Sequence, residues 1–530
     1  MLKYKSIIIF TLLFTLLFYA IIGSYLSITN GISHDQWHEQ LNWSVNFNAI
    51  KGLFNNNGDY EILINYIDKY HGIGFHYFSQ PIQFITHKFI ANLNQVSDIS
   101  AYYISRHLAV FLIFSISAIF FYLLSLKVSS DKKFSVMSTF IYLLYPYFFG
   151  HAQINGKDIP FMSLWVICNY YLFTIIENFY FDKKNSFKTI LSISFFTAFL
   201  ISIRITGVII IIEYFIALII FINIKDIKIF AFLNNNKNFI ILFSFLLCLF
   251  VYILNPVLWL NPLEFFKSIE WMEKYYHDIC TLTLGKCMRA QNLPASYIFI
   301  WFFFKLPILI LIGLAMYPFV EKKIMNNGIK TIYYLTLVFT LLGILSIFII
   351  KKVALYDEIR HIMFLIPLIF LIALYNIFLL NKKVYYILTI LVSIFFVFEN
   401  ASLKKYQYTW LNSFAKLTNI EKNFQIDYLG ISNKNISKKI ISHATKNNLN
   451  KDICIYGGPY TEAFLEKRGF SCFDTYGIVD AVINRPFYAY QNVRNIKRSK
   501  PKDCNLIHLE KYNYFFYSKD IIAAKLWYCD

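Results

Sequence analysis

The stretch TILSISFFTAFLISIRITGVIIIIEYFIALIIFINI, residues 189–224, is strongly apolar and is interrupted near its middle by Arg204. A helix that crosses a membrane needs about 20 residues, so the stretch is too long for one such helix. Arg204 divides it, and Gly207, a residue that permits tight turns, follows shortly after. The stretch therefore predicts two membrane helices joined by a tight hairpin at Arg204.

The same pattern recurs along the whole chain, which has 57% hydrophobic and 15% charged residues. Aromatic residues make up 20%, as expected for helices that face lipid and carry aromatic belts at both membrane interfaces. The first apolar run is longer than the core of a typical secretory signal and lacks a clear small-residue cleavage site, so we expect it to be a retained helix. Apolar runs predict eleven spans, at residues 6–28, 107–127, 134–149, 161–181, 189–203, 207–224, 239–258, 296–320, 332–350, 361–380 and 384–400.

Lysines gather in alternate connections, which the positive-inside rule places in the cytoplasm together with the N-terminus. The other connections, including residues 29–106, and the tail after residue 400 then lie on the periplasmic side of a cell inner membrane. Lys351 and Lys352 are exceptions that topology does not explain. The lysines of the cytoplasmic connections are a better explanation of the net charge of +19 than nucleic-acid binding is. Some of the positive charge also suits an anionic lipid substrate. The cytoplasmic set is Lys3, Lys5, Lys127, Lys132, Lys133, Lys183, Lys184, Lys188, Lys225, Lys228, Lys237, Lys322, Lys323, Lys330, Lys382 and Lys383.

The cysteines agree with this orientation. Two, Cys168 and Cys248, fall inside predicted spans, and the other six fall in segments assigned to the outside, where an oxidising compartment permits disulfides. Cys280 and Cys287 could close a short loop. The four in the tail allow three connectivities, and the sequence does not choose among them or exclude unpaired thiols.

Composition changes after residue 400, where the chain becomes rich in Lys and Asn and has no further span. Residues 453–456 and 514–517 look like strands, and residues 461–468 like a short helix. We therefore predict an all-α polytopic membrane module at 1–400, with a large outer loop at 29–106, and a small extracytoplasmic α/β domain at 401–530.

The outer loop contains the motif HDQWHE, residues 34–39. Asp35 lies just beyond the end of the first span, where partial shielding from water can tune a carboxylate for general-base work. An Asp in this position is also a common N-cap for a helix that begins near residue 36. His34 and His38 are spaced to share one helix face, which would suit a metal site, but loop histidines are mostly solvated and we predict none.

Three later positions also carry charge at the edge of the membrane. Asp158 precedes Pro160 and could simply cap the next helix, with Lys157 neutralising its charge. A charged guanidinium inside an apolar stretch is energetically unfavourable, so the Arg204 side chain either extends (snorkels) to the membrane interface or binds a phosphate. The paired N–H donors of a guanidinium match the oxygens of a phosphate. Arg360 and His361 begin a span on the same side and offer a second phosphate site, again with snorkelling as the ordinary alternative.

In this order the motifs resemble a family. The acidic motif at 34–39, HAQINGKDIPF at 151–161, the hairpin arginine, NPVLWLNP at 255–262, YDEIRH at 356–361 and DYLGIS at 427–432 are together similar to the GT-C superfamily of polytopic glycosyltransferases. The nearest likeness is to the protein mannosyltransferase and ArnT-like branch, which includes RgtA/B/C/D-like enzymes. The resemblance runs along nearly the whole chain, and its specificity comes from the order of the motifs.

The resemblance implies an active site at the outer membrane surface and transfer of a sugar from a polyprenyl-phosphate donor, usually with inversion. It makes Asp35 the candidate base and Asp158 a second catalytic acid that positions the acceptor or assists Asp35. By the same resemblance Arg204 would face the donor phosphate. To these we add our own candidates: Arg360, His361 and Lys157 for binding the phosphate, and Glu39 and His151 as auxiliary residues. Many relatives have Asp-Glu in the first loop, whereas Gln36 follows Asp35 here, so either Glu39 substitutes or one acid suffices.

The expected function is therefore a membrane hexosyl- or pentosyltransferase whose acceptor is lipid A, another glycan or a protein. The partners are a polyprenyl-phosphate-linked sugar, membrane lipids and the acceptor, without nucleic acid. No cofactor is required by the sequence, and a divalent cation remains open. A transporter or flippase of lipid-linked sugars is the alternative from another class, although no internal repeat is visible. An O-antigen ligase or polymerase is a further alternative and would rely on outer-loop arginines and histidines.

Overall fold

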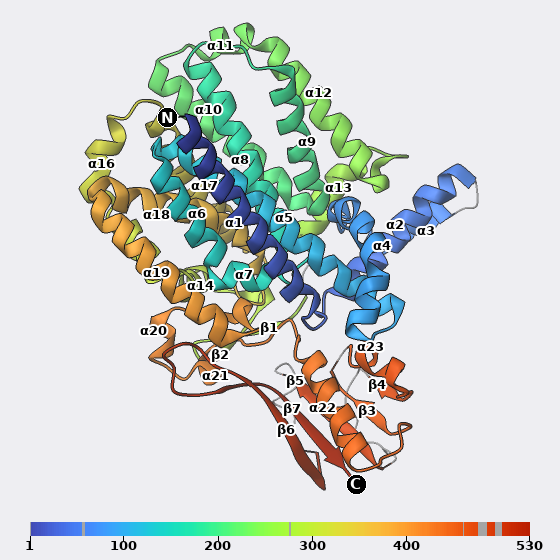
Figure 1. The fold of residues 1–530 in the computed structure, drawn as a ribbon. Helices are drawn as coiled ribbons and strands as arrows, with labels where there is room; N and C mark the ends of the chain where they lie inside the picture. The colour runs from blue at the N-terminus through green and yellow to red at the C-terminus, as the bar shows by residue number, and fades with distance from the viewer. Residues whose placement is uncertain (1, 56–58, 275–276, 459, 475–484, 493–500) are drawn as a thin grey trace.

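The computed structural model describes residues 2–55, 59–274, 277–458, 460–474, 485–492 and 501–530, with side chains from Thr15 onward apart from that of Lys274. The side chains of Lys3 and Lys5 thus lie outside the described part. Long helices form a bundle, and a smaller domain containing a sheet lies at one end of it (Figure 1). The predicted fold class, a helical polytopic protein with a small α/β domain, is confirmed.

The bundle consists of helices that are apolar along most of their length. Within the described residues, seven helical stretches are long and apolar enough to cross a membrane, and the pair α14–α15, bent by 117°, is an eighth candidate. The helices are α1 (Leu2–Ile28), α5 (Asp98–Ser129), α6 (Lys132–Leu144), α8 (Asp158–Tyr180), α9 (Phe187–Ile203), α10 (Ile210–Lys225), α12 (Lys237–Leu254), α14 (Ser296–Lys305), α15 (Ile308–Ala315), α16 (Tyr317–Met325), α17 (Ile329–Ile350), α18 (Ile366–Leu380) and α19 (Lys382–Leu403).

Each of the eleven predicted spans coincides with one or more of these helices, although the number of spans stays a prediction. The break at Arg204 is confirmed: α9 ends at Ile203, Arg204 is extended, and the 3-10 turn η1 (Ile205–Ile209) leads into α10. Several predicted boundaries are wrong. The span predicted at 239–258 ends at Leu254, and the span predicted at 296–320 is broken by the bend between α14 and α15. The span expected to begin at residue 107 begins at Asp98, and Pro146 ends the span predicted at 134–149 by starting the separate helix α7 (Pro146–Ala152).

Two spans form the centre of the bundle. The apolar window of Arg360–Leu380, which joins η4 (Arg360–Leu365) to α18, is 94% buried inside the protein, and that of α8 is 83% buried. By contrast, the window of α12 is 11% buried and that of α19 is 22% buried, so these helices are peripheral and present their apolar side chains to lipid. Both central spans begin with residues that the sequence analysis selected, Asp158 and Arg360.

The outer connections form further helices and a short hairpin, and the hairpin β1–β2 lies at the end of the bundle where the C-terminal domain lies (Figure 1). Within residues 29–106, α4 leaves Phe84, Ile85 and Phe89 strongly exposed, as expected for a helix that lies along a membrane interface. The elements of the outer connections are α2 (Gln36–Asn55), α3 (Asp59–Asn65), α4 (Gly74–Asn94), η2 (Pro256–Leu258), α13 (Glu264–Lys274), β1 (Cys280–Thr283), β2 (Lys286–Arg289) and η3 (Ala290–Asn292). On the opposite side of the bundle, α11 (Ile229–Asn235) joins α10 to α12.

Among its described residues, the C-terminal part has a five-stranded mixed sheet in the order β4-β3-β5-β7-β6, with α22 (Asn433–Lys446) packed on it. The strand predicted at 453–456 and the helix predicted at 461–468 are confirmed, but the strand predicted at 514–517 is wrong: those residues form the turn between β6 and β7, where Phe516 has a positive φ. The proposed domain boundary near residue 401 stays a prediction. The elements are η5 (Gln407–Thr409), α20 (Ser413–Lys416), α21 (Ile420–Asn423), α22, β3 (Cys454–Tyr456), α23 (Glu462–Leu465), η6 (Glu466–Arg468), β4 (Phe473–Asp474), β5 (Phe487–Asn492), β6 (Cys504–Tyr512) and β7 (Ile521–Cys529).

The six cysteines assigned to the outside are paired. Cys280–Cys287 closes the β1–β2 hairpin, as expected, and Cys454–Cys472 and Cys504–Cys529 resolve the connectivity that the sequence left open. The two cysteines predicted inside spans, Cys168 and Cys248, are free thiols. The pairing agrees with an oxidising compartment for this end of the molecule.

Candidate active site

A cavity of about 430 Å³ opens where the two central spans begin and α9 ends. Its walls come from the turn before α2, from the connection between α3 and α4, from the break after α9 and from residues 353–361. Six of the eight residues that the sequence analysis selected line it: Asp35, Glu39, Lys157, Arg204, Arg360 and His361. The other two, Asp158 and His151, are buried behind its wall.

Asp35 faces the cavity from the turn that precedes α2. The helix begins at Gln36, as the capping alternative expected, and the Asp35 carbonyl accepts the Glu39 N–H at 3.2 Å. The Asp35 side chain is 44% exposed, and its Oδ2 lies 2.5 Å from Nη1 of Arg360, whose side chain is only 6% exposed. The carboxylate is thus held by a buried cation and still open to a reactant.

Arg360 is positioned by an unusual piece of backbone. The two residues Asp357 and Glu358 both have positive φ, 53° and 70°, a conformation that costs free energy in non-glycine residues. It is held because the Asp357 N–H donates to the Thr281 hydroxyl at 2.9 Å and the Tyr297 hydroxyl donates to the Glu358 carbonyl at 3.0 Å. The turn places the Asp357 carboxylate 3.4 Å from Arg360, which balances the guanidinium from its buried side.

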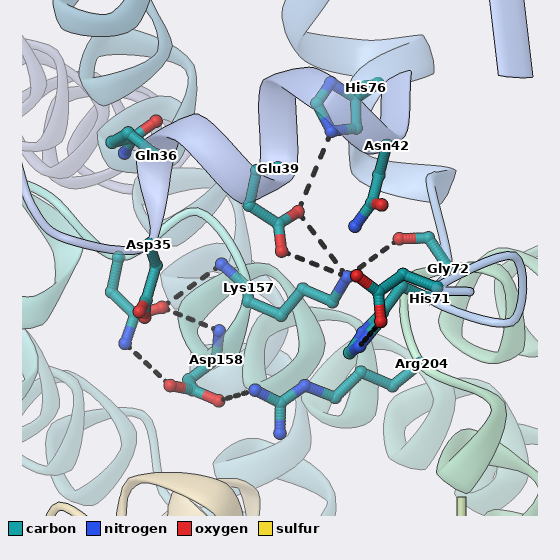
Figure 2. Close-up of polar contacts among 12 residues, drawn as sticks. Asp35, Gln36, Glu39, Asn42, His71, Gly72, His76, Lys157, Asp158 and Arg204 are labelled. Carbon is teal, nitrogen blue, oxygen red and sulfur yellow. Dashed lines mark hydrogen bonds and ion pairs between the residues drawn. The ribbon is translucent and has the colours of Figure 1, made fainter. Parts of the chain in front are cut away.

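Asp158 holds Arg204 in place. Its Oδ1 accepts a hydrogen bond from Nη2 of Arg204, and its Oδ2 accepts one from the Asn155 amide at 2.7 Å (Figure 2). The Asn155 side chain in turn accepts the backbone N–H groups of Lys157 and Asp158 and so caps the start of α8. Asp158 is 3% exposed, and Arg204 lies between it and the cavity. Asp158 therefore acts on the cavity through Arg204.

Glu39 belongs to a second charged group on the same wall. Its carboxylate lies 3.2 Å from Nζ of Lys157 and 3.7 Å from Nε2 of His76, and Lys157 also donates to the Gly72 carbonyl at 2.8 Å (Figure 2). Burial alone would raise the pKa of Glu39, but Lys157 and His76 together hold it well below its ordinary value. Burial lowers the pKa of Lys157, and Glu39 opposes that change. Glu39 is thus an ionised partner of Lys157.

Gln36, which replaces the Glu of many relatives, points away from the cavity. It is 2% exposed, its amide donates to the Ile154 carbonyl at 3.2 Å, and its oxygen accepts from Nη1 of Arg106 at 3.3 Å. A carboxylate at this position would meet Arg106 inside the protein. The departure from the Asp-Glu pattern therefore removes no acid from the cavity.

Several predicted and unpredicted histidines surround the site. His151 bonds to the Tyr428 hydroxyl at 2.9 Å and is fully buried, so it supports the wall without lining the cavity. His34 precedes α2, so the predicted shared helix face with His38 is wrong. Within the described part of the chain, no three His, Cys, Asp or Glu side chains come together as metal ligands. The histidines that line the cavity are His34, His38, His71, His277 and His361.

Residues whose role depends on contacts with distant parts of the chain were not identified from the sequence patterns. Arg106 lies inside α5 and bonds to Gln36, to Gln40 at 2.7 Å and to Nδ1 of His76 at 3.2 Å. The sequence places it at the end of the outer loop predicted at 29–106, and its position directly before the apolar run at 107–127 is the signal that marks it. Lys351, an unexplained exception to the topology, pairs with Glu273 at 3.0 Å on the outer side.

Lowering the pH below 6.5 should destabilise the protein through His76. Burial of this ring and the positive charge of the neighbouring Arg106 lower the pKa of His76 to about 3. An unfolded chain takes up a proton near pH 6.5 that the folded chain refuses, so the free energy of unfolding falls by about 1.4 kcal/mol per pH unit between 6.5 and 3. Thermal unfolding of the purified protein between pH 8 and pH 5 measures this slope.

His76→Gln should reduce the slope. His71, whose pKa is also lowered to about 3 by burial and by Lys157, keeps part of the slope in this variant. Equal slopes in the wild type and in His76→Gln would contradict the assignment.

Comparison with known proteins gives a likeness in structure alone. No protein-family model matches the chain, and no curated protein sequence matches it. The crystal structure of ArnT from Cupriavidus metallidurans bound to undecaprenyl phosphate is similar over 98% of this chain and 98% of its own, with 9% identity and a TM-score of 0.44. The apo structure of the same protein is similar over 99% and 98%, with 8% identity and a TM-score of 0.44.

Proposed function

We propose that this chain is a membrane glycosyltransferase that moves a sugar from a polyprenyl-phosphate donor to a hydroxyl group of a lipid, glycan or protein acceptor. The observation that carries the proposal is the composition of the cavity. The Asp35 carboxylate, which is 44% exposed, faces a space that also receives Arg204, Arg360 and Lys157. A base for a hydroxyl and cations for a phosphate are the two requirements of this transfer.

The position of the cavity supports a lipid-linked donor. Asp158 and Arg360 are the first residues of the two central spans, and Arg204 follows the last residue of α9. Because the ends of spans lie at the membrane surface, a phosphate carried on a membrane lipid would reach these cations while its chain stays in the bilayer. A soluble nucleotide sugar needs no such placement.

The distribution of lysines supports the extracytoplasmic face. The lysine-containing connections on either side of α11 lie at the end of the bundle opposite to the C-terminal domain (Figure 1). The positive-inside rule assigns that end to the cytoplasm. The three disulfides lie at the cavity's end, where they suit the periplasm.

The reaction is a single displacement with inversion. Asp35 takes the proton of the acceptor hydroxyl as its oxygen forms a bond to the anomeric carbon, and the bond from that carbon to the phosphate oxygen breaks. The electron pair leaves with the polyprenyl phosphate, whose charge Arg204 and Arg360 stabilise. Protonation of Asp35 weakens its ion pair with Arg360 at the moment when the leaving phosphate gains charge. The pair therefore couples proton removal to departure of the lipid.

Mass spectrometry of surface glycolipids and glycoproteins, from cells with and without the gene, tests the proposal. We expect one hexose or pentose to be absent without the gene, which identifies sugar and acceptor together. Purified protein in detergent micelles, supplied with lipid extract from the cells that lack the gene and with the unmodified acceptor identified in this way, should then form the missing product. A flippase acts only across a sealed bilayer, so failure to form product in micelles would contradict glycosyl transfer.

A further inference from the structure

The turn that carries Asp35 is held by the C-terminal part of the chain. The His34 N–H donates to the Leu429 carbonyl at 3.0 Å. Asn433, the first residue of α22, pairs with Ile32 as a neighbouring strand would: its oxygen accepts the Ile32 N–H at 3.2 Å and its amide donates to the Ile32 carbonyl at 2.7 Å. Both hydrogen-bonding groups of the Ile32 backbone are thus paired with one side chain.

Tyr460 holds the other end of the same turn. Its hydroxyl accepts the Trp37 N–H at 2.8 Å and donates to the His34 carbonyl at 3.5 Å. The N–H of Trp37 belongs to the first turn of α2, and the N–H groups of a first turn have no acceptor within their own helix. Tyr460 itself has a φ of 66°, a backbone conformation that is uncommon for residues other than glycine.

Between these two contacts, the His34 ring lies against backbone that admits no larger residue. Gly430 has a φ of 67°, and a Cβ there would come within 2.2 Å of Nε2 of His34. Asn492, at the end of β5, lies 3.4 Å from the same nitrogen. The turn at 32–37 is therefore enclosed by three separate segments of the C-terminal part, around residues 430, 460 and 492.

We infer that the C-terminal domain sets the position of the catalytic base, with Asn433 and Tyr460 as positioning residues for Asp35. The inference rests on the proposed function. Asp35 directly follows His34 and precedes Trp37 by two positions, and it must remain 2.5 Å from Arg360, which belongs to a different element. A shift of about 1 Å in a catalytic group can cost 100-fold in rate. The domain that follows the membrane module is thus part of the active site's frame.

Tyr460→Phe and Asn433→Ala test the inference, with matched controls in the same domain. Tyr488→Phe removes a hydroxyl that bonds His443 at 2.9 Å, and Asn435→Ala removes an amide that bonds Glu510 at 2.7 Å, both away from the turn. We expect the two test variants to lower the initial rate of transfer about 10-fold, measured with lipid extract from cells lacking the gene. The controls should stay within two-fold of the wild type, and binding of undecaprenyl phosphate should stay within two-fold in all four.

Hydrogen exchange shows whether the turn itself has changed. The amides of Trp37 and Ile32 should exchange faster in Tyr460→Phe and in Asn433→Ala respectively, and thermal stability should match that of the controls. Unchanged rates of transfer together with faster exchange would overturn the inference, because the turn would then have moved without consequence for the reaction.

A double-variant cycle with Asp35→Asn separates positioning of the base from general support of the fold. Residues that act through one group are not additive with its removal. In the Asp35→Asn background, Tyr460→Phe should therefore cause no further loss of the residual transfer, whereas an independent 10-fold loss would overturn the inference. If Asp35→Asn alone keeps full activity, the role proposed for Asp35 fails and this inference falls with it; if Asp35→Asn is inactive and Tyr460→Phe is fully active, only the inference fails.

Discussion

Asp35→Asn should lower the rate of sugar transfer about 1000-fold, because a positioned general base contributes roughly 100- to 10,000-fold. Binding of undecaprenyl phosphate to the purified variant should be equal to that of the wild type or tighter. In the free protein, Nη1 of Arg360 lies 2.5 Å from Oδ2 of Asp35 and pairs with its negative charge. Once that charge is removed, the guanidinium is available to bind the phosphate. Initial rates with lipid extract and binding by titration of intrinsic tryptophan fluorescence measure the two quantities.

Two matched variants decide which carboxylate is the base. Glu39→Gln removes a second acid of the cavity, but its partner Lys157 fixes it on the wall, so we expect a loss of about 10-fold or less. Gln36→Glu restores the Asp-Glu pattern of many relatives and should not raise the rate, since the side chain meets Arg106 inside the protein. If Glu39→Gln rather than Asp35→Asn abolished transfer, Glu39 would be the base.

The arrangement of the spans could be predicted from the sequence because the membrane makes apolar length the dominant signal. The break at Arg204 was visible for the same reason, since a charge followed closely by a glycine inside a long apolar stretch marks the point where one helix ends and the next begins. The turn at 514–517 was predicted as a strand because aromatic residues favour strands. What local preference does not contain is the pairing of β6 with β7, which runs from Cys504–Cys529 to Tyr512–Ile521 and shifts register twice in between.

The sequence predicts the site residues that are marked by the free-energy cost of a charge at the edge of the bundle. It does not predict the residues whose role depends on the direction of the side chain. Asp35, Arg204 and Arg360 stood out because charge at the edge of a bundle is expensive. The roles of Asp158 and Gln36 depend on which way a side chain points, and spacing in a loop does not determine that. The contacts of Asn433 and Tyr460 with the Asp35 turn join segments about 400 positions apart, and no pattern in one sequence reveals such a pair.

Asp158 and Arg204 form a pair whose two effects on stability and on binding can be separated. Removing one partner leaves the other charged group buried and unpaired, at a cost of about 3–5 kcal/mol, whereas replacing both by neutral groups that can bond each other avoids that cost. Arg204→Gln alone should therefore lower the thermal stability strongly, and the double variant Asp158→Asn/Arg204→Gln should recover most of it. Thermal unfolding of the three proteins measures this part.

Binding should not recover together with stability. A hydrogen bond to a charged group contributes about 1.5–3 kcal/mol, so loss of the Arg204 guanidinium should weaken the affinity for undecaprenyl phosphate roughly 10- to 100-fold in both the single and the double variant. Arg289→Gln is the matched control, because it removes an arginine from an exposed pair with Asp278 and should change neither quantity appreciably. Recovery of affinity in the double variant would show that Arg204 does not contact the phosphate.

Asp158→Asn alone then tests how Asp158 acts. If it works through Arg204, as its burial behind the guanidinium indicates, the variant should weaken donor binding while the rate at saturating donor falls less than 10-fold. A 1000-fold fall in that rate with unchanged donor binding would instead place Asp158 in the chemical step beside Asp35. The contrast between the two aspartates is therefore measurable: Asp35 should affect the rate with little effect on donor binding, and Asp158 should affect donor binding with little effect on the rate.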